Sequence, residues 1–307
     1  MPNEADELDL ISEIYKPGWL DDEREVETIM ESQPFPAFGN TPAGSDPIQL
    51  PDSVLGWKLH ERVTGKPWPS GSQGNVGSCV SWGTRNGATL TMLAQIAAGS
   101  NEEFADIAQE PIYALSRVEI GKRKLGRNDG SIGAWAAEAV RAFGVIKRGV
   151  YGNIDLTKYS EARCKEWGWI GLPDELEPVA KERPIKAYSK VMSVDECQRA
   201  LAQGYGVNVC SNQGFRLSRD SDGFCAPRGT WAHSMAIIGY QLGKRPGFFI
   251  LNSWGADAYS GPMGLGDGPG GGFWAEADVV ERMLKRGDSY CYSSFNGFPA
   301  QRPNFYF

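Results

Sequence analysis

The spacing of the apolar residues changes partway along the chain, and this change constrains the fold more than any other feature. In the first half, apolar residues recur at the three- and four-residue intervals of amphipathic helices. Three helices are predicted there, over residues 77–98, 102–122 and 131–143. After about residue 185 the apolar residues form short runs between turns, which predict strands. The clearest runs are 205–209, 235–240 and 248–251. Helices followed by strands predict an α+β chain with two lobes.

The N-terminal segment differs in charge from the rest of the chain. Residues 1–31 contain eleven acidic and two basic residues, a net charge of −9 within a chain whose total is −7. Two short helices are predicted in this part, over residues 4–15 and 21–31. A proline-rich strap over 32–50 follows them. We interpret residues 1–48 as an acidic arm that packs on its own enzyme or docks a protein partner, because its first helix would otherwise expose an apolar face. A partly disordered tail is the alternative.

Composition argues against several classes of protein. Lys and Arg form no cluster with interleaved aromatic residues, so no nucleic-acid surface is expected. No apolar run approaches the ~18 residues that a membrane span needs. The first residues lack the basic and apolar regions of a secretory signal, so we expect a cytoplasmic protein, or one carried in an assembly such as a virus particle. The six cysteines form no Cys-x-x-Cys pair and the chain has two histidines, so no metal site is expected.

A candidate nucleophile lies at the start of the helix predicted over 77–98. The glycine-containing segment from Gln73 to Ser78 leads directly into Cys79. The unpaired N–H groups and the dipole of a helix N-terminus stabilise an anion there. A thiolate is the nucleophilic form of cysteine, and this position is expected to lower its pKa.

A cysteine nucleophile needs a base, and the chain offers two histidines. His60 lies in a polar context and is interpreted as a surface residue. His233 lies at the entrance to the apolar run 235–240, where a strand would hold its side chain rigidly. His233 is therefore the candidate base, although a structural histidine remains the alternative for this residue alone.

The segment that follows the apolar run 248–251 supports the choice of His233 as the base. The apolar run 248–251 ends in Asn252, Ser253, Trp254 and Gly255. The carbonyl of Asn252 can accept from one imidazole nitrogen and fix the tautomer of the base. The ring of Trp254 could shield that hydrogen bond from water.

Taken in order, these segments resemble the papain family of cysteine peptidases. Gln73 precedes Cys79 by six residues, as the oxyanion-hole glutamine of that family precedes its nucleophile. The sequence from Asn252 to Gly255 is identical to the family's Asn-Ser-Trp-Gly segment, and the likeness spans about residues 50–296. The resemblance implies a helical lobe facing a β-barrel-like lobe, with the active-site cleft between them. We place these lobes at residues 49–165 and 166–307, after the arm of 1–48.

The resemblance also implies a set of substrate-binding residues. Residues 129–131 and the helix after them resemble the glycine-bearing edge of the family's cleft, and the two residues before the histidine depart from the usual small ones. Trp231 is expected to narrow or fill a specificity pocket. The complete set of candidates is Gly130, Ser131, Trp231, Ala232 and Trp254.

The remaining cysteines allow one expectation from the family. Papain relatives carry a disulfide in the β lobe at places similar to Cys225 and Cys291, so we expect these two residues to be neighbours. A reducing compartment would leave them as thiols. A pair between Cys210 and Cys225 is the alternative, and Cys164 and Cys197 are expected to be unpaired.

The sequence therefore predicts a cysteine endopeptidase that acts on peptides or proteins. Cys79 would attack, His233 would transfer protons, Asn252 would orient His233, and Gln73 would help to bind the oxyanion. The resemblance implies neither a metal nor an organic cofactor. Two alternatives remain open: a papain-like structural component, for example of a virus particle, and an acyltransferase or cell-wall peptide hydrolase that reuses a Cys/His arrangement.

Overall fold

The computed structural model describes residues 15–32, 36–303 and 305. One sheet dominates the C-terminal half, with strand order β4-β9-β5-β6-β7-β8, and β1 pairs with β6 outside this path. Its strands are β1 (Ser53–Leu55), β4 (Ala187–Lys190), β5 (Val207–Arg219), β6 (Cys225–Gln241), β7 (Gly247–Leu251), β8 (Gly272–Glu276) and β9 (Tyr290–Ser293). Every pairing in it is antiparallel. A separate two-stranded ribbon joins β2 (Val150–Tyr151) to β3 (Ile154–Asp155).

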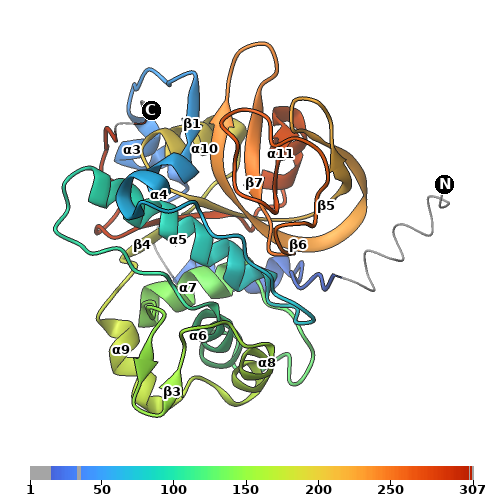
Figure 1. The fold of residues 1–307 in the computed structure, drawn as a ribbon. Coiled ribbons are helices and arrows are strands. Elements are labelled where there is room, and N and C mark those ends of the chain that lie inside the picture. Colours follow the sequence, from blue (N-terminus) through green and yellow to red (C-terminus); the bar gives the residue numbers. More distant parts are fainter. Residues whose placement is uncertain (1–14, 33–35, 304, 306–307) are drawn as a thin grey trace, which may run out of the picture.

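In Figure 1, α5 lies between the strands and the group of helices in the lower half of the view, whereas α11 lies among the strands of the upper right. The helices of residues 56–202 are α4 (Gly56–Thr64), α5 (Cys79–Ala97), α6 (Gln109–Ala114), the π-helix η2 (Leu115–Ile120), α7 (Gly133–Phe143), α8 (Glu161–Ile170), η3 (Asp174–Leu176), α9 (Glu177–Lys181) and α10 (Val194–Ala202). Outside that range lie α2 (Glu23–Ser32), η1 (Phe38–Asn40), α3 (Pro42–Ser45) and α11 (Ala277–Leu284). The expected α+β class is confirmed.

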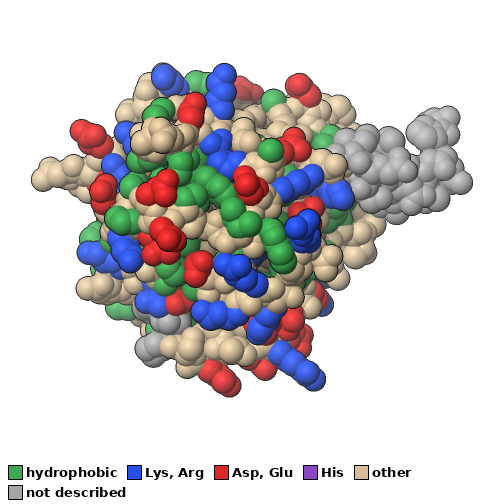
Figure 2. Space-filling model, turned by 90° about the horizontal axis from the view of Figure 1, so that it is seen from below, with side chains coloured by type: hydrophobic (Ala, Val, Ile, Leu, Met, Phe, Trp, Pro, Cys, Tyr) green, Lys and Arg blue, Asp and Glu red, His purple; other side chains and the backbone are tan. Residues whose placement is uncertain are grey.

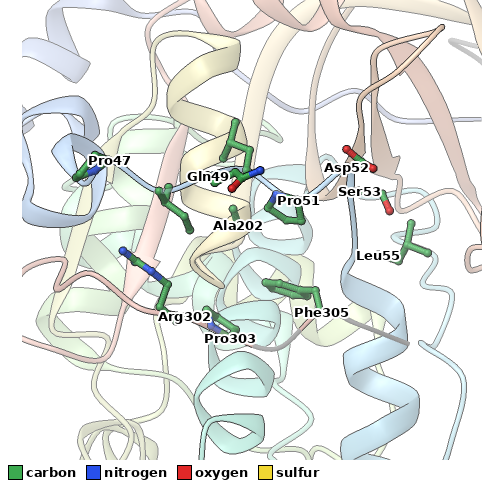
Figure 3. Close-up of a pocket in the computed structure, with 12 residues that line it drawn as sticks. Pro47, Gln49, Pro51, Asp52, Ser53, Leu55, Ala202, Arg302, Pro303 and Phe305 are labelled. Carbon is green, nitrogen blue, oxygen red and sulfur yellow. The ribbon is translucent and has the colours of Figure 1, made fainter.

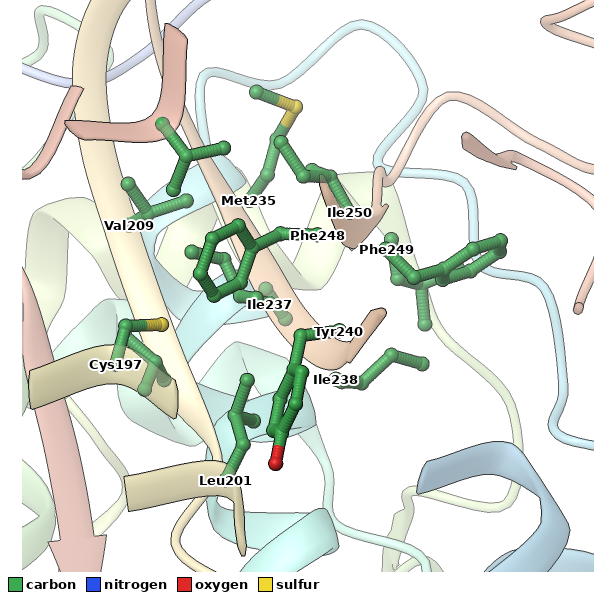
Figure 4. Packing of buried hydrophobic residues seen from close by; sticks show 14 of the residues in the cluster. Cys197, Leu201, Val209, Met235, Ile237, Ile238, Tyr240, Phe248, Phe249 and Ile250 are labelled. Carbon is green, nitrogen blue, oxygen red and sulfur yellow. The ribbon is translucent and has the colours of Figure 1, made fainter. Parts of the chain in front are cut away.

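The core explains why α5 and the sheet stay together. Nearly the whole of α5 is buried, from Cys79 to Gln95, so this helix is enclosed rather than amphipathic. The strands β6 and β7 contribute a continuous apolar layer, part of which Figure 4 shows around Ile237, Tyr240 and Phe248. Antiparallel strands covered on both faces carry apolar residues at successive positions, as β7 does throughout.

Several predicted helices are confirmed within a few residues, but the one over 102–122 is not. Helix α6 begins only at Gln109, and Pro111 lies in its first turn. A proline there is tolerated because the first N–H groups of a helix have no intrahelical partner. In the middle of a helix that began at residue 102, the same proline would remove a hydrogen bond and clash. The helix predicted over 4–15 lies outside the described residues, apart from Tyr15.

The cysteine pairing expected from the family is wrong. All six cysteines are free and buried. Along β5, Val207 pairs with Cys291 while Arg219 pairs with Cys225, so the two cysteines lie near opposite ends of this strand. Twelve residues of strand correspond to a contour of about 40 Å, whereas disulfide bonding needs Cα atoms within ~7 Å. The alternative partner Cys210 pairs with Ser234, also far along the strand from Cys225.

His60 is also not the surface residue that the sequence suggested. It is buried, and its Nδ1 lies 2.8 Å from the carbonyl oxygen of Lys66. Burial lowers the pKa of its imidazole, so this histidine serves the packing around α4.

Three observations concern the surface charge, membrane spans and metal sites. On the face seen from below in Figure 2, basic and acidic side chains are intermingled rather than separated by sign. Among the described residues, no helix is long and apolar enough to cross a membrane. Within the same residues, no group of three or more His, Cys, Asp or Glu side chains is arranged to hold a metal ion.

The strap that leads to β1 is attached to the core through Phe38. This ring is fully buried and packs edge-on against Phe298, with ring centroids 5.7 Å apart. We expect Phe38→Ala to lower the free energy of unfolding by about 3–5 kcal/mol, because it leaves a cavity as well as losing apolar contact. Denaturant unfolding measures this change. Phe295→Ala is the matched control, since that ring is 43% exposed and should change the stability little. Equal losses in the two variants would show that Phe38 does not anchor the strap.

Candidate active site

The candidate nucleophile is the first residue of α5. A loop from Gln73 to Ser78 brings the chain to Cys79, which is completely buried. Backbone N–H groups of Ser234 and Val80 lie next to its sulfur. Because Ser234 directly follows His233 in β6, this contact brings the thiol to the strand that carries the candidate base.

The candidate base is held by an amide, as the sequence predicted. Nε2 of His233 lies 2.7 Å from Oδ1 of Asn252, and both side chains are buried. Nδ2 of Asn252 donates to the Tyr259 hydroxyl at 2.7 Å, so its Oδ1 is the atom turned toward the ring. The ring of Trp254 lies over the pair, with its centroid 4.6 Å from that of His233. None of the described residues forms a hydrogen bond with Nδ1 of His233, so this nitrogen is available for proton transfer.

Gln73 is oriented by Ser253, a role that the sequence did not suggest. The hydroxyl of Ser253 donates to Oε1 of Gln73 at 2.7 Å. Nε2 of the same amide donates to the carbonyl oxygens of Val76 and Lys16, at 2.8 and 2.6 Å. Ser253 therefore decides which end of the amide faces the position where a substrate carbonyl would lie.

The N-terminal segment from Tyr15 to Leu20 occupies this position. Tyr15 stacks on Trp254, with ring centroids 4.5 Å apart. The carbonyl of Lys16 takes the Gln73 hydrogen bond, and the N–H of Gly18 lies next to the Cys79 sulfur.

The same segment then bridges the helical part and the sheet. The N–H of Trp19 donates to the carbonyl of Ala232 at 3.2 Å, and the N–H of Leu20 donates to the carbonyl of Ser131 at 2.9 Å. The N–H of Ser131 in turn donates to the carbonyl of Gly18 at 2.8 Å, a parallel bridge. Residues 15–20 thus contact both the helical part and the sheet at the candidate site.

This covering changes the electrostatics that the sequence predicted. Burial raises the pKa of the Cys79 thiol to about 12 and outweighs the nearby N–H groups, which favour the thiolate. Burial also lowers the pKa of His233 to about 4, although the hydrogen bond that its Nε2 donates to Asn252 acts in the opposite direction. The expectation of a lowered thiol pKa is therefore wrong for the covered site, where both groups are uncharged at neutral pH. Exposure to water would remove the cause of both shifts.

The predicted substrate-binding residues divide into two groups. Ser131 and Ala232 contact the bound segment through their backbones, and Gly130 lies against Gly18 and Leu20. Trp231 packs edge-on against Trp254 at 4.8 Å, within a cluster of aromatic rings. A residue that the sequence analysis missed is Asp288, which is buried and accepts from the indole of Trp19 at 2.7 Å. No local motif marks Asp288, because its partners come from distant segments.

A large cavity lies elsewhere. It measures about 970 Å³, and Figure 3 shows lining residues from the strap and β1, such as Pro47 and Leu55, beside Arg302 and Phe305. Cys79 and His233 are not among the described residues that line it. The candidate chemistry therefore belongs to the site covered by Tyr15–Leu20 and not to this cavity.

Comparisons with known proteins bear on the fold of the chain. No family model and no curated protein matches the sequence. Among solved structures, the cysteine protease xylellain from Xylella fastidiosa is similar over 91% of this chain and 96% of its own, at 18% identity and a TM-score of 0.60. Procathepsin B from Trypanosoma congolense matches 94% of this chain and 87% of its own, at 11% identity and a TM-score of 0.53. The proform of a ragweed pollen cysteine protease matches 84% of this chain and 62% of its own, at 15% and 0.53. The chain therefore has the fold of the papain-like cysteine proteases.

Proposed function

We propose that this protein is a cysteine endopeptidase whose nucleophile is Cys79 and whose general base is His233. The observation that carries the proposal is the buried hydrogen bond between His233 and Asn252, formed next to the strand residue that contacts the thiol. A nucleophile, a base and a group that orients the base are the three parts of this type of catalysis.

The chemistry follows from these positions. His233 takes the thiol proton, and the sulfur of Cys79 attacks the substrate carbonyl carbon. Gln73 Nε2 and the Cys79 N–H stabilise the oxyanion of the tetrahedral intermediate. Collapse of the intermediate breaks the peptide bond, and the protonated His233 gives its proton to the leaving amine. Water, deprotonated by His233, then attacks the thioester and releases the acid product with the free thiol.

We further propose that residues 15–20 hold the enzyme in a latent state. Lys16 uses the Gln73 donor, and Gly18 covers the thiol. Helix α2 continues the arm and supports this position: Glu25 pairs with Lys124 and accepts from the Trp135 indole at 3.2 Å. Two of the structural neighbours named above are proforms, which agrees with a covering N-terminal segment. This proposal favours docking of the arm on its own enzyme over docking on a partner.

A thiol-directed peptidyl epoxide tests the proposed activity without a known substrate. We expect it to label Cys79 only when the arm is displaced, and to leave the five other buried cysteines unmodified. Mass spectrometry locates the label. Failure to label Cys79 in a folded, arm-released variant would favour a structural role for the fold.

The contact between Ser253 and Gln73 gives a prediction about catalysis. We expect Ser253→Ala to lower kcat by about 10-fold with little change in KM, because the Gln73 amide loses its orientation and the oxyanion loses part of its stabilisation. Steady-state kinetics on the arm-released enzyme measures both constants. Ser100→Ala, at an exposed serine, is the matched control. A rise in KM alone would instead mean that Ser253 helps to bind the ground state.

A further inference from the structure

The side chain of Trp19 fills a pocket that opens on the candidate active site. Its backbone N–H pairs with Ala232, directly before the candidate base. Its ring is 1% exposed and belongs to the buried apolar cluster that includes Ile132, Ala134 and Tyr290. The arm therefore inserts a large side chain beside the catalytic groups, where an extended substrate would also have to lie.

Asp288 is the charged group of this pocket, and the hydroxyl of Tyr290 lies beside its carboxylate. Oδ2 of Asp288 accepts from the Trp19 indole N–H and from the N–H of Gly133, both at 2.7 Å. Its Oδ1 accepts from the N–H of Ala134 at 2.8 Å. A Cβ atom at Gly133 would lie 2.8 Å from Oδ1, so glycine is needed for this approach.

The carboxylate does not depend on the arm for its position. Two of its three hydrogen bonds come from the first N–H groups of α7, an eleven-residue helix whose N-terminus favours a negative charge. These two hydrogen bonds do not involve the arm, so we expect them to hold Asp288 when the arm leaves and the indole donor is lost. The oxygen that accepted from the indole then faces water, and a ligand that brings an N–H donor into the pocket replaces the water with a charge-assisted hydrogen bond.

From this geometry we infer that Asp288 is a specificity-determining residue and that the pocket of Trp19 is a substrate subsite for a tryptophan side chain. The inference rests on the proposed peptidase function and names a preference for that activity. An indole suits the pocket because it combines a flat apolar body with one N–H donor. Phenylalanine fills the same walls but leaves Asp288 without its donor. An arginine brings five donors, most of which would face apolar walls.

Binding and turnover give separate tests. Calorimetry measures the affinity of short peptides for the full chain that carries Gly18→Val and Cys79→Ala. We expect the first substitution to release the arm, because an added Cβ would lie 2.1 Å from the carbonyl oxygen of Gly77, and the second prevents cleavage. The peptides carry Trp, Phe or Arg at each position in turn. We expect Trp to bind about 10- to 100-fold more tightly than Phe at one position, the effect of one hydrogen bond to a charged acceptor.

The variant Asp288→Asn is the key comparison. It is nearly isosteric, but it is uncharged and offers one acceptor oxygen in place of two, so the indole N–H meets either the Nδ2 donor or a weaker, neutral acceptor that it shares with the N–H of Gly133. We expect the preference for Trp over Phe to fall by about 5-fold or more, because the charge-assisted hydrogen bond is lost, while Phe peptides bind as before. The same preference should appear in kcat/KM when Cys79 is present.

The outcomes test the tryptophan subsite and the peptidase activity separately. Equal affinity for Trp and Phe, a stronger preference for Arg, or no measurable binding would overturn the subsite assignment. Selective Trp binding without any turnover by the Cys79 enzyme would leave the subsite intact and overturn the peptidase proposal alone.

Discussion

In an arm-released form of the protein, Cys79→Ala and His233→Ala are each expected to lower kcat/KM by a factor of about 10⁴ or more. Cys79 supplies the atom that bonds to the substrate, and His233 moves its proton, so neither loss can be replaced by water. Peptide hydrolysis measured with fluorogenic substrates checks both variants. Circular dichroism confirms that each variant keeps its fold.

Two further variants make this expectation specific. Asn252→Ala should reduce the activity less, because Asn252 only orients the imidazole, through the 2.7 Å hydrogen bond to Nε2. His60→Gln should leave the activity unchanged, since His60 contacts Lys66 and lies in α4. An equal loss in His60→Gln and His233→Ala would mean that the base has been misassigned.

The second large effect is expected from Gly18→Val. A Cβ atom at Gly18 would lie 2.1 Å from the carbonyl oxygen of Gly77, a backbone atom that has no rotamer to change. Overpacking of this kind costs about 1–3 kcal/mol or more, which favours the uncovered site over the covered one. We expect the rate of epoxide labelling at Cys79 and the peptidase activity to rise together, by about 10- to 100-fold.

The matched control is Gly149→Ala. The position has no positive φ, and the nearest atoms to an added Cβ lie 3.7 Å away, in Tyr151. Labelling and activity should stay at the level of the unmodified protein. If Gly18→Val folds normally and changes neither quantity, the segment around Gly18 does not limit access to Cys79, and the proposed latency should be abandoned.

The pH dependence of the covered state has opposing contributions. The pKa of His233 is about 4 under the arm, so the uncovered state binds the additional proton as the pH falls below the ordinary histidine range. The pKa of Asp288 is raised to about 6, mainly by burial. Below that pH the Asp288 carboxyl therefore binds a proton in the covered state before it does so in the uncovered state. Acid therefore favours opening through His233 and closure through Asp288, which makes steric release a cleaner test than a change of pH.

Local sequence determined the parts of this protein that depend on neighbouring residues. A helix start and a strand end have local sequence signals. These signals identified the turn into α5 with Cys79 at its start, and the strand that ends just before Asn252. The order of helices and strands in the two halves likewise follows from apolar periodicity, which each element carries in its own residues.

Tertiary structure alone decided the environment of these groups. The segment Tyr15–Leu20 lies over Cys79, and Asp288 meets Trp19 and the start of α7. The distance along β5 that separates Cys225 from Cys291 was equally invisible in the sequence. Such contacts join residues far apart in the chain, and no local pattern encodes which distant surfaces meet. The pKa of Cys79 shows the consequence: the helix start favours a thiolate, but burial by a segment sixty residues away in the sequence outweighs it.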